Sequence, residues 1–579
     1  MRYDIVIVSY RSKKWLPACI AALHRADYDL KELNVIVVDN ASQDETVETI
    51  RSLQKEYKDF GGFELIESQK NLGFGGGCNK GAFHGSAPLI FMLNVDTELE
   101  PDAFKELDKV IEQRPDGAAF ELRQKPVEVG RHNHPVTMEC SWNSGAAVVY
   151  RREVYEAAEG FDEHMFMYCE DVDLSWRIRA MGYKLIYVPR AGVYHYTRRN
   201  DVKKEFHEYH WTLYNKLMMH YKYGNIKSIF QGNKEYLHAL RYPHHFDYVR
   251  RVLAKNYLKH FLHLWPFLFW RFKHRKLMKK VPVTYIEGFE IMRSLYDFIP
   301  LKRRPLVSVI IRTCSRPAVL RETLRAMRHQ TYRNFEILVQ EDGAPTAQKM
   351  IEEEFSDLPI RYEASGEHIG RSRSGNRALA RAKGEFFNFL DDDDYFYPEH
   401  IELMLSTFEK HADADIVTNG YMVYKVNVTS TEPYEYEVKE LEYHHPDRID
   451  LLQMCKKCQI PILSAMFRRE LYDKVGGLRE DVDTNEDWAM WLKFFMLKPK
   501  VYMNARATCG FFFPAHSKDS KEKIASYRAN YHKVIEDENL KVELTGKELN
   551  EMYNLMLADI NNMNIIGHLN GFIRDNMAF

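Results

Sequence analysis

The sequence has no excess of charge of one sign, no long apolar run and no cysteine framework, and each absence excludes a class of protein. Its 81 Lys and Arg residues nearly balance its 83 Asp and Glu residues, so no global field would attract nucleic acid. No apolar run reaches the roughly 18 to 20 residues that a membrane-spanning helix needs. Met1 leads directly into an apolar strand, so we expect no signal peptide.

The eight cysteines are scattered, which is typical of reduced thiols in a cytosolic protein. Cys455-x-x-Cys458 lacks a second pair of ligands, so a zinc site there is disfavoured. The composition, with 45% hydrophobic and 28% charged residues, is that of an ordinary folded protein. A chain of 579 residues exceeds what one hydrophobic core supports, so we expect two large domains with additional segments.

One series of strands, acids and a histidine occurs twice along the chain. Each copy has an apolar strand, a second strand that ends in an acid, and a third that runs into an acidic turn. An acidic pair then opens a helix, and a lone histidine closes the series. The two copies are 4–9, 35–39, 89–96, Glu170-Asp171 and His195, then 305–312, 335–342, 386–394, Glu486-Asp487 and His516. This repeat predicts an enzyme with two active sites.

The alternation of strands and helices divides the chain into four parts. Residues 1–200 and 305–519 show the α/β pattern that implies a mostly parallel sheet. Between them, 201–304 predicts a bridge of long aromatic and basic helices, and 520–579 predicts closing helices.

The acidic turns indicate a metal. An Asp-x-Asp turn after an apolar strand places carboxylates where α/β sheets bind ligands. Two carboxylates with substrate phosphates suit Mg²⁺ or Mn²⁺. Asp391–Asp394 concentrates four negative charges, which we expect to repel strongly without a nearby cation; a solvated acidic loop is the alternative. Asn94-Val95-Asp96 is a weaker signal, because Asn94 contributes a neutral oxygen.

Five segments carry a resemblance to a known family: 37–44, 71–79, 167–177, 370–376 and 389–394. Together they resemble the inverting family 2 glycosyltransferases of GT-A fold, and the first module looks most like the bacterial rhamnosyl- and galactofuranosyltransferase branch. The resemblance covers about two thirds of the chain and excludes the bridge and the tail. It implies two GT-A domains, which are Rossmann-like nucleotide-diphospho-sugar transferase folds.

The resemblance also implies a donor site. It assigns Asp39 and Asp342 to the pyrimidine ring, whose N3–H a carboxylate can accept; a turn or helix cap is the alternative. Further donor-binding residues are Ser9, Tyr10, Arg11, Asn71, Gly73, Asn79, Asn94, Arg312, Thr313, Arg371, Asn376, Asp391 and Asp392. The glycine-rich 71–79 could let the backbone approach the sugar diphosphate. Its spacing and position do not fit a dinucleotide fingerprint, so an oxidoreductase is disfavoured.

Inversion at the sugar needs a base that takes a proton from the acceptor hydroxyl. The resemblance assigns this role to Asp171 and Asp487, each at a helix start, where the helix dipole favours a carboxylate. Simple helix capping is the alternative. The implied metal ligands are Asp96, His195, Asp393 and His516, although a lone histidine is more often structural.

The bridge contains an aromatic segment, 257–270, followed by a basic one, 271–276. Such a pair suits a helix that lies in a membrane interface; a buried helix between the modules is the alternative. Pro266 interrupts the apolar run. The candidate membrane face is Phe261, Leu264, Trp265, Phe267, Leu268 and Trp270, with Arg271, Lys273, Arg275 and Lys276 beside it.

The sequence thus predicts a bifunctional transferase, cytoplasmic and peripheral to the inner face of the membrane, that extends a bacterial surface polysaccharide. The expected donor is dTDP-rhamnose or a UDP-sugar, and the expected acceptor is a lipid-linked glycan. Two alternatives remain: one catalytic module with a glycan-binding or scaffolding copy, and a carbohydrate-binding scaffold with both sites inactive.

Overall fold

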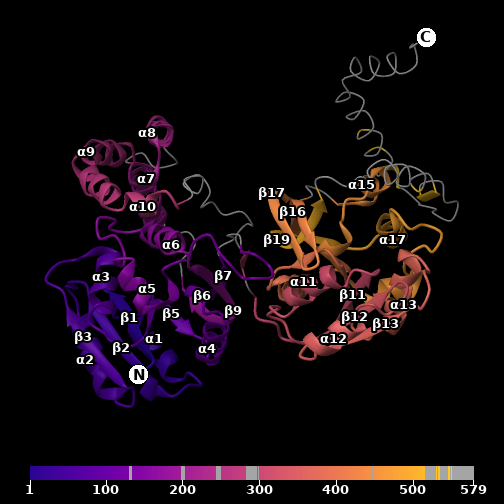
Figure 1. Ribbon diagram of the computed structural model, residues 1–579, viewed down its shortest axis with the longest axis horizontal. Helices are drawn as coiled ribbons and strands as arrows, with labels where there is room; N and C mark the ends of the chain where they lie inside the picture. Colours follow the sequence, from indigo (N-terminus) through magenta and orange to yellow (C-terminus); the bar gives the residue numbers. More distant parts are fainter. Residues whose placement is uncertain are drawn as a thin grey trace, which may run out of the picture.

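The computed structural model describes residues 1–128, 133–196, 202–242, 249–281, 296–297, 299–445 and 449–514, together with 530, 533–534, 545–547, 550 and 554. The chain forms two α/β modules, with a group of helices on the first one (Figure 1). The predicted His516 and most of the predicted C-terminal helices lie outside the described residues.

The first module is built on one eight-stranded sheet in the order β3-β2-β1-β4-β8-β6-β9-β5. Its strands are β1 (Tyr3–Ser9), β2 (Leu33–Asp39), β3 (Gly62–Glu67), β4 (Leu89–Leu93), β5 (Thr97–Leu99), β6 (Gly117–Lys125), β8 (Ala147–Arg151) and β9 (Lys184–His195). Its α-helices are α1 (Leu16–His24), α2 (Thr46–Glu56), α3 (Gly73–Ala82), α4 (Ala103–Gln113), α5 (Arg152–Ala157) and α6 (Glu170–Ala180).

The sheet is mixed rather than mostly parallel. Strands β1 to β4 are parallel, whereas β8 runs antiparallel to both β4 and β6. Every residue of β2 and β4 is buried, which agrees with their continuous apolar sequences, since helices cover both faces of the sheet.

The second module repeats this order as β13-β12-β11-β14-β18-β16-β19-β15, with β17 added beside β16. Its strands are β11 (Val307–Thr313), β12 (Phe335–Glu341), β13 (Ile360–Ala364), β14 (Phe386–Asp391), β15 (Tyr395–Phe396), β16 (Ile416–Thr431), β17 (Tyr434–His444), β18 (Ala465–Arg468) and β19 (Val501–Pro514). Its α-helices are α11 (Pro317–Met327), α12 (Gln348–Glu354), α13 (Arg371–Arg381), α14 (His400–Lys410), α15 (Leu451–Lys456), α16 (Arg469–Val475) and α17 (Glu486–Phe495). The prediction of two α/β domains is confirmed.

The bridge consists of α7 (Val202–Tyr223), α8 (Ile226–Arg241), α9 (Val249–Lys273) and the short α10 (Arg275–Met278). Helix α9 continues through Pro266. The buried face of α7, including Leu217 and Tyr223, packs against Val172 and Trp176 of α6. No described helix combines the length and apolarity needed to cross a bilayer.

Buried ion pairs join the two modules. Arg123 on β6 lies 2.6 Å from Glu402 on α14. Arg506 on β19 lies 2.8 Å from Glu399 of its own module and 3.5 Å from Glu128, which belongs to the short strand β7 (Val127–Glu128). Because these charges are desolvated and paired, they favour one fixed arrangement of the modules.

Candidate functional site

The two acidic turns occupy equivalent positions. The ladders pair Val6 of β1 with Met92, and Ile310 of β11 with Phe389. Counting onward from these pairs places Asn94 and Asp96 where the second module has Asp391 and Asp393. The turns therefore correspond residue by residue, at the carboxyl ends of parallel strands where such sheets bind ligands.

In the first module the turn faces the predicted histidine. His195 Nε2 lies 3.3 Å from Asp96 Oδ1, and His195 Nδ1 lies 2.8 Å from Gln124 Oε1. Gln124 thus orients the ring, as partners of metal-ligating histidines commonly do. One carboxylate oxygen and one imidazole nitrogen at this distance fit a divalent ion.

The second module has a different residue at the position of His195. Thr97 pairs with His195 between β5 and β9, whereas Tyr395 pairs with Gly510 between β15 and β19. By the same counting, the equivalent of His195 is Phe511. The predicted His516 lies outside the described residues, so this register does not test it.

Two arginines neutralise the acidic turn of the second module. Arg312 Nη2 lies 2.6 Å from Asp391 Oδ1. Arg316 pairs with Asp392 and lies 3.0 Å from Asp393 Oδ2. Burial works against ionisation of Asp391, but the Arg312 guanidinium holds its pKa below the usual value. The nearby positive charge that these acids were expected to need is supplied by the two arginines, so charge balance alone does not require a metal ion.

The other two acids of this turn point into the protein. Asp392 accepts a 2.6 Å hydrogen bond from Thr313 Oγ1, and Asp394 accepts a 3.0 Å bond from the backbone N–H of Phe512. Burial raises the pKa of Asp392 to about 7 and that of Asp394 well above its usual value. Asp391 and Asp393 are therefore the acids best placed to meet a ligand.

The two predicted bases have the same local geometry. Cys169 and Asn485, which precede helices α6 and α17, both adopt left-handed backbone conformations, with φ of 67° and 63°. Asp171 Oδ1 then accepts from the N–H of the next residue at 2.8 Å, and Asp487 Oδ1 does the same at 2.7 Å.

Each base lies close to its acidic turn. In the first module, Gly145 N donates to Asp171 Oδ2 at 3.1 Å, and the adjacent Ala146 carbonyl accepts from Asn94 N at 2.8 Å. In the second module, Arg312 contacts both Asp391 and Glu486, the neighbour of Asp487.

The pKa of the second base, Asp487, is shifted upward. Burial, with Glu486 adding to it, raises the pKa of Asp487 to about 7. A carboxylate with such a pKa can accept a proton near neutral pH.

The glutamates beside the bases differ between the modules. Glu486 is paired with Arg312 at 2.8 Å. In the first module, strand register puts Val8 at the position of Arg312. Within the described part of the chain, Glu170 Oε2 is buried without a hydrogen-bond partner. Burial and the adjacent Asp171 raise the pKa of Glu170 well above its usual value.

The strand registers of the two modules show that the two predicted donor acids, Asp39 and Asp342, are one position apart rather than equivalent. Ser9 pairs with Asp39, whereas Thr313 pairs with Glu341. Asp342 is therefore equivalent to Asn40, not to Asp39. The hydrogen bonds agree: Asn40 Oδ1 accepts from Leu72 N at 2.9 Å, and Asp342 Oδ1 accepts from Ile369 N at 2.7 Å.

Asp39 retains an open acceptor. Its Oδ2 accepts from Ser42 N at 3.0 Å, but its Oδ1 and the hydroxyl of Ser9 are buried without a partner among the described residues. Because a buried orphan acceptor is costly, these two atoms suit a ligand that brings a donor. Glu341 is instead satisfied, by the N–H of Ala347 at 3.0 Å and the hydroxyl of Tyr362.

The glycine-rich segment serves packing. It forms α3, and an added Cβ would lie 2.8 Å from Val8 at Gly77 and 2.5 Å from Val6 at Gly81. These glycines therefore let α3 approach β1 closely. The approach of the segment's backbone to a sugar diphosphate stays a prediction.

Two predicted donor-binding asparagines tie helices to loops. Asn79 Nδ2 donates to the Phe161 carbonyl, and Asn376 Nδ2 donates to the Leu478 carbonyl, both at 2.9 Å. Asn71 Oδ1 likewise accepts from Gly73 N at 2.9 Å.

Other predicted residues are more open. Tyr10 and Arg11 are exposed after β1, and Arg371 lies partly exposed 3.6 Å from Glu486. Sequence reasoning missed Arg316, although its place three residues after β11, before the helix-starting Pro317, was a usable signal. It also missed the cluster of Cys314, Asp342 and His368, whose ligand atoms lie within 4.8 Å of one another.

A family model described as "Glycosyl transferase family 2" matches residues 4–174 and 308–476, which is more than half of the chain. An uncharacterized glycosyltransferase of Rickettsia felis is 25% identical over 260 residues, which are 41% of this chain and 40% of that protein. The uncharacterized glycosyltransferase YwdF of Bacillus subtilis is 26% identical over 240 residues, 40% of this chain and 81% of the relative. The chain thus spans less than half the length of the Rickettsia relative.

Among solved structures, the mannosyltransferase PcManGT of Pyrobaculum calidifontis, in complex with GDP-Man and Mn²⁺, is 15% identical with a TM-score of 0.33. It matches over 50% of this chain and 88% of its own. S. aureus TarS 1-349, in complex with UDP-GlcNAc, is 17% identical with a TM-score of 0.34, over 42% of this chain and 70% of its own.

Proposed function

The chain belongs to glycosyl transferase family 2, and from this premise we propose that both modules transfer a sugar, with inversion, from a nucleotide-diphosphate donor to a glycan hydroxyl. One observation carries the proposal. In each module an aspartate lies in the first turn of an α-helix that follows a residue with left-handed backbone conformation. In each module this aspartate lies beside an acidic turn, and the two turns occupy the same position in strand register. This is the arrangement that a base and a donor site need.

The proposed reaction is a direct displacement. Asp171 or Asp487 takes the proton of the acceptor hydroxyl while that oxygen forms a bond to the anomeric carbon. The bond from the anomeric carbon to the donor diphosphate breaks, and the nucleoside diphosphate leaves with the electron pair. The pKa of about 7 at Asp487 suits this proton transfer.

The residues that would hold Mg²⁺ or Mn²⁺ are Asp96 with His195 in the first module and Asp393 in the second. A divalent ion would stabilise negative charge on the leaving diphosphate. The first set fits directly, since its two ligand atoms lie 3.3 Å apart. In the second module Arg316 would first have to release Asp393.

The open acceptor of Asp39 supports a pyrimidine nucleotide, so we propose dTDP-rhamnose or a UDP-sugar as the donor of the first module. The proposed product is a bacterial cell-surface polysaccharide. Because the two sites lie on one chain, an acceptor extended at one site would reach the other site at high effective concentration.

We also propose that the bridge contacts the inner face of the membrane, where a lipid-linked acceptor would be presented. Exposed apolar side chains recur every three or four residues along α9. This set, the apolar stripe, is Leu258, Phe261, Leu262, Trp265, Phe269 and Phe272, each more than half exposed. Ile226 and Phe230 on α8 are also exposed. Such an amphipathic helix suits an interfacial location.

The opposite side of α9 packs against the protein, with Leu253, Leu264 and Phe267 buried. Of the candidate face, Leu264 and Phe267 are therefore core residues, whereas Phe261 and Trp265 are exposed. Helix α9 thus combines a buried side with an exposed one.

The bridge also touches the first base loop. Asn215 on α7 donates to the carbonyls of Met167 and Tyr168 at 2.9 and 2.8 Å, shortly before Asp171. Contact with a membrane would therefore place the acceptor side of this module near the lipid surface.

A second candidate function is one catalytic module with a glycan-binding copy. The ion pairs of Arg316 with Asp392 and Asp393 favour an inactive second module, because they occupy the carboxylates of its acidic turn. In the first module, the neutral Asn94 offers a weaker metal ligand than an aspartate would.

Substituting each base separately tests the proposal. Asp171→Asn and Asp487→Asn keep the side-chain shape but remove proton acceptance, which typically costs about 10² to 10⁴-fold in rate. Donor turnover with a panel of nucleotide sugars should show two activities, each lost in one variant. If only one variant changes activity, the single-site alternative holds; if neither does, both base assignments fail.

A further inference from the structure

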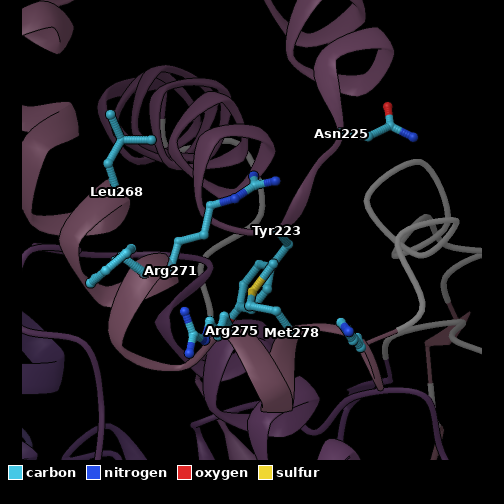
Figure 2. Close-up of a pocket in the computed structure, with 8 residues that line it drawn as sticks. Tyr223, Asn225, Leu268, Arg271, Arg275 and Met278 are labelled. Atoms are coloured by element: carbon cyan, nitrogen blue, oxygen red, sulfur yellow. The ribbon is translucent and has the colours of Figure 1, made fainter.

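The bridge helices line an open cavity of about 500 Å³, and neither proposed catalytic base is among its lining residues. Its lining combines apolar groups with cations (Figure 2). The apolar part comes from Tyr223, Leu268, Phe272 and Met278, the cations are Arg271, Arg275 and Lys279, and Asn225 completes the wall. A cavity of this size holds a small amphiphilic ligand.

Among the residues that the structure describes, the lining of this cavity contains cations and no acid. Arg271 donates to the carbonyls of Tyr221 and Gly224 at the end of α7, which fixes its position. Arg275 and Lys279 have no ion-pair partner within the described ranges, and both are exposed. An anion would supply the missing partner.

One neighbour makes the contrast clear. Lys273, two residues before Arg275, is paired with Glu159 at 2.7 Å. The cations that line the cavity are therefore unlike this adjacent basic residue, which already has a carboxylate.

The start of α8 adds to the positive field. Asn225 caps this helix by accepting from Ser228 N at 2.9 Å, and the positive end of the helix dipole lies at the cavity wall.

The cavity also adjoins the apolar stripe. Phe272 lines the cavity and is 72% exposed, so it belongs to both features. A molecule seated among the cations can therefore continue along the stripe with an apolar chain.

We propose that this cavity binds the phosphate headgroup of an anionic phospholipid, with the first acyl carbons against Leu268, Phe272 and Met278. The inference rests on the proposed membrane contact of the same bridge, and it adds a specific headgroup site to a non-specific apolar surface. Arg275 and Lys279 would contact the phosphate, while Arg271 stays with the carbonyls of α7.

A monomeric lipid separates this site from general attraction to a charged bilayer. The probe is dihexanoyl phosphatidylglycerol below its micelle concentration, titrated calorimetrically into the full chain. Arg275→Ala with Lys279→Ala should weaken binding on the order of thirtyfold. The matched control, Lys276→Ala with Lys280→Ala, removes the same charge from residues outside the cavity lining and should change binding by less than about threefold.

Three results would overturn the proposal: no binding by the wild-type chain, an equal loss in both double variants, or equally tight binding of inorganic phosphate. The last would show that the apolar wall contributes nothing. Thermal melts of both variants should match wild type, since all four side chains are exposed.

Donor turnover on a soluble acceptor, measured on the same samples, separates this inference from the transferase proposal. It should be unchanged in both double variants. Vesicle binding without monomeric-lipid binding would reject the headgroup site while leaving the membrane contact intact.

Discussion

At the scale of single residues, the base of the second module predicts a pH-dependent rate. Burial and Glu486 raise the pKa of Asp487 to about 7, and only the deprotonated carboxylate can accept a proton. In an Asp171→Asn background, which isolates the second module, kcat should therefore fall about tenfold per pH unit below 7 and level off above it. A flat profile between about pH 5.5 and 7.5 would show that Asp487 is not the base that limits the rate.

Arg316 predicts how the second module responds to metal. Because its guanidinium holds Asp392 and Asp393, a divalent ion must compete with it. Arg316→Ala should lower the Mg²⁺ or Mn²⁺ concentration for half-maximal transfer by about tenfold, and EDTA should abolish transfer by both modules. The control is Arg321→Ala on α11, the helix that follows Arg316, which loses pairs with Glu354 and Glu432 instead. Full activity in EDTA, or an unchanged metal requirement in Arg316→Ala, contradicts the metal assignment.

At the scale of elements, the sequence predicted three parallel strands in each module and both base helices, because their signals are local. Asp171 and Asp487 lie at the second position of α6 and α17, one residue after the predicted acidic pairs begin. The offset between Asp39 and Asp342 was not predictable from the acids alone. It depends on strand register, which only the ladder from Thr313 to Glu341 shows.

The same limit applies to contacts across the fold. The role of Gly77 depends on Val8, which is 69 positions earlier in the chain. The partners of Arg316 follow it by more than 70 residues, so no short motif connects them. For α9, spacing identified an apolar helix, but only packing against α7 distinguishes buried Phe267 from exposed Trp265.

The apolar stripe therefore predicts membrane binding that can be removed without unfolding. Leu262, Trp265 and Phe269 are exposed, and inserting each into lipid is worth at most roughly 1.5 to 3 kcal/mol. Changing all three to Ser should release the protein from anionic vesicles in a sedimentation assay and leave its melting temperature unchanged. Phe267→Ser, in the buried face, should instead destabilise the protein. If the wild type does not sediment at low salt, the membrane contact is excluded.

At the scale of the whole molecule, the two modules are held by more than the chain that connects them. Besides the buried ion pairs, His329 of the second module lies 2.9 Å from the Val136 carbonyl of the first. His134 lies 3.1 Å from the hydroxyl of Tyr436, a residue of the aromatic cluster around Tyr395 and Phe512. That cluster lies next to the acidic turn, because Phe512 N donates to Asp394. The first module thus supports the wall of the second site.

The ion pair between Arg123 and Glu402 tests whether this arrangement matters. Glu402→Gln removes the nearer of two acids that pair with the Arg123 guanidinium, since Glu402 lies at 2.6 Å and Glu128 at 3.4 Å, and the guanidinium is only 2% exposed. Breaking a buried pair in this way typically costs about 3 to 5 kcal/mol, and the loss should appear in chemical denaturation as an earlier transition. Glu409→Gln, on the same helix, removes a 3.7 Å pair with the exposed Lys302 and should cost no more than about 1 kcal/mol. Donor turnover by each module should survive in Glu402→Gln, while products made from one acceptor become shorter, because the spacing of the two sites is no longer fixed. Wild-type stability together with wild-type product length would show that the modules act independently of their interface.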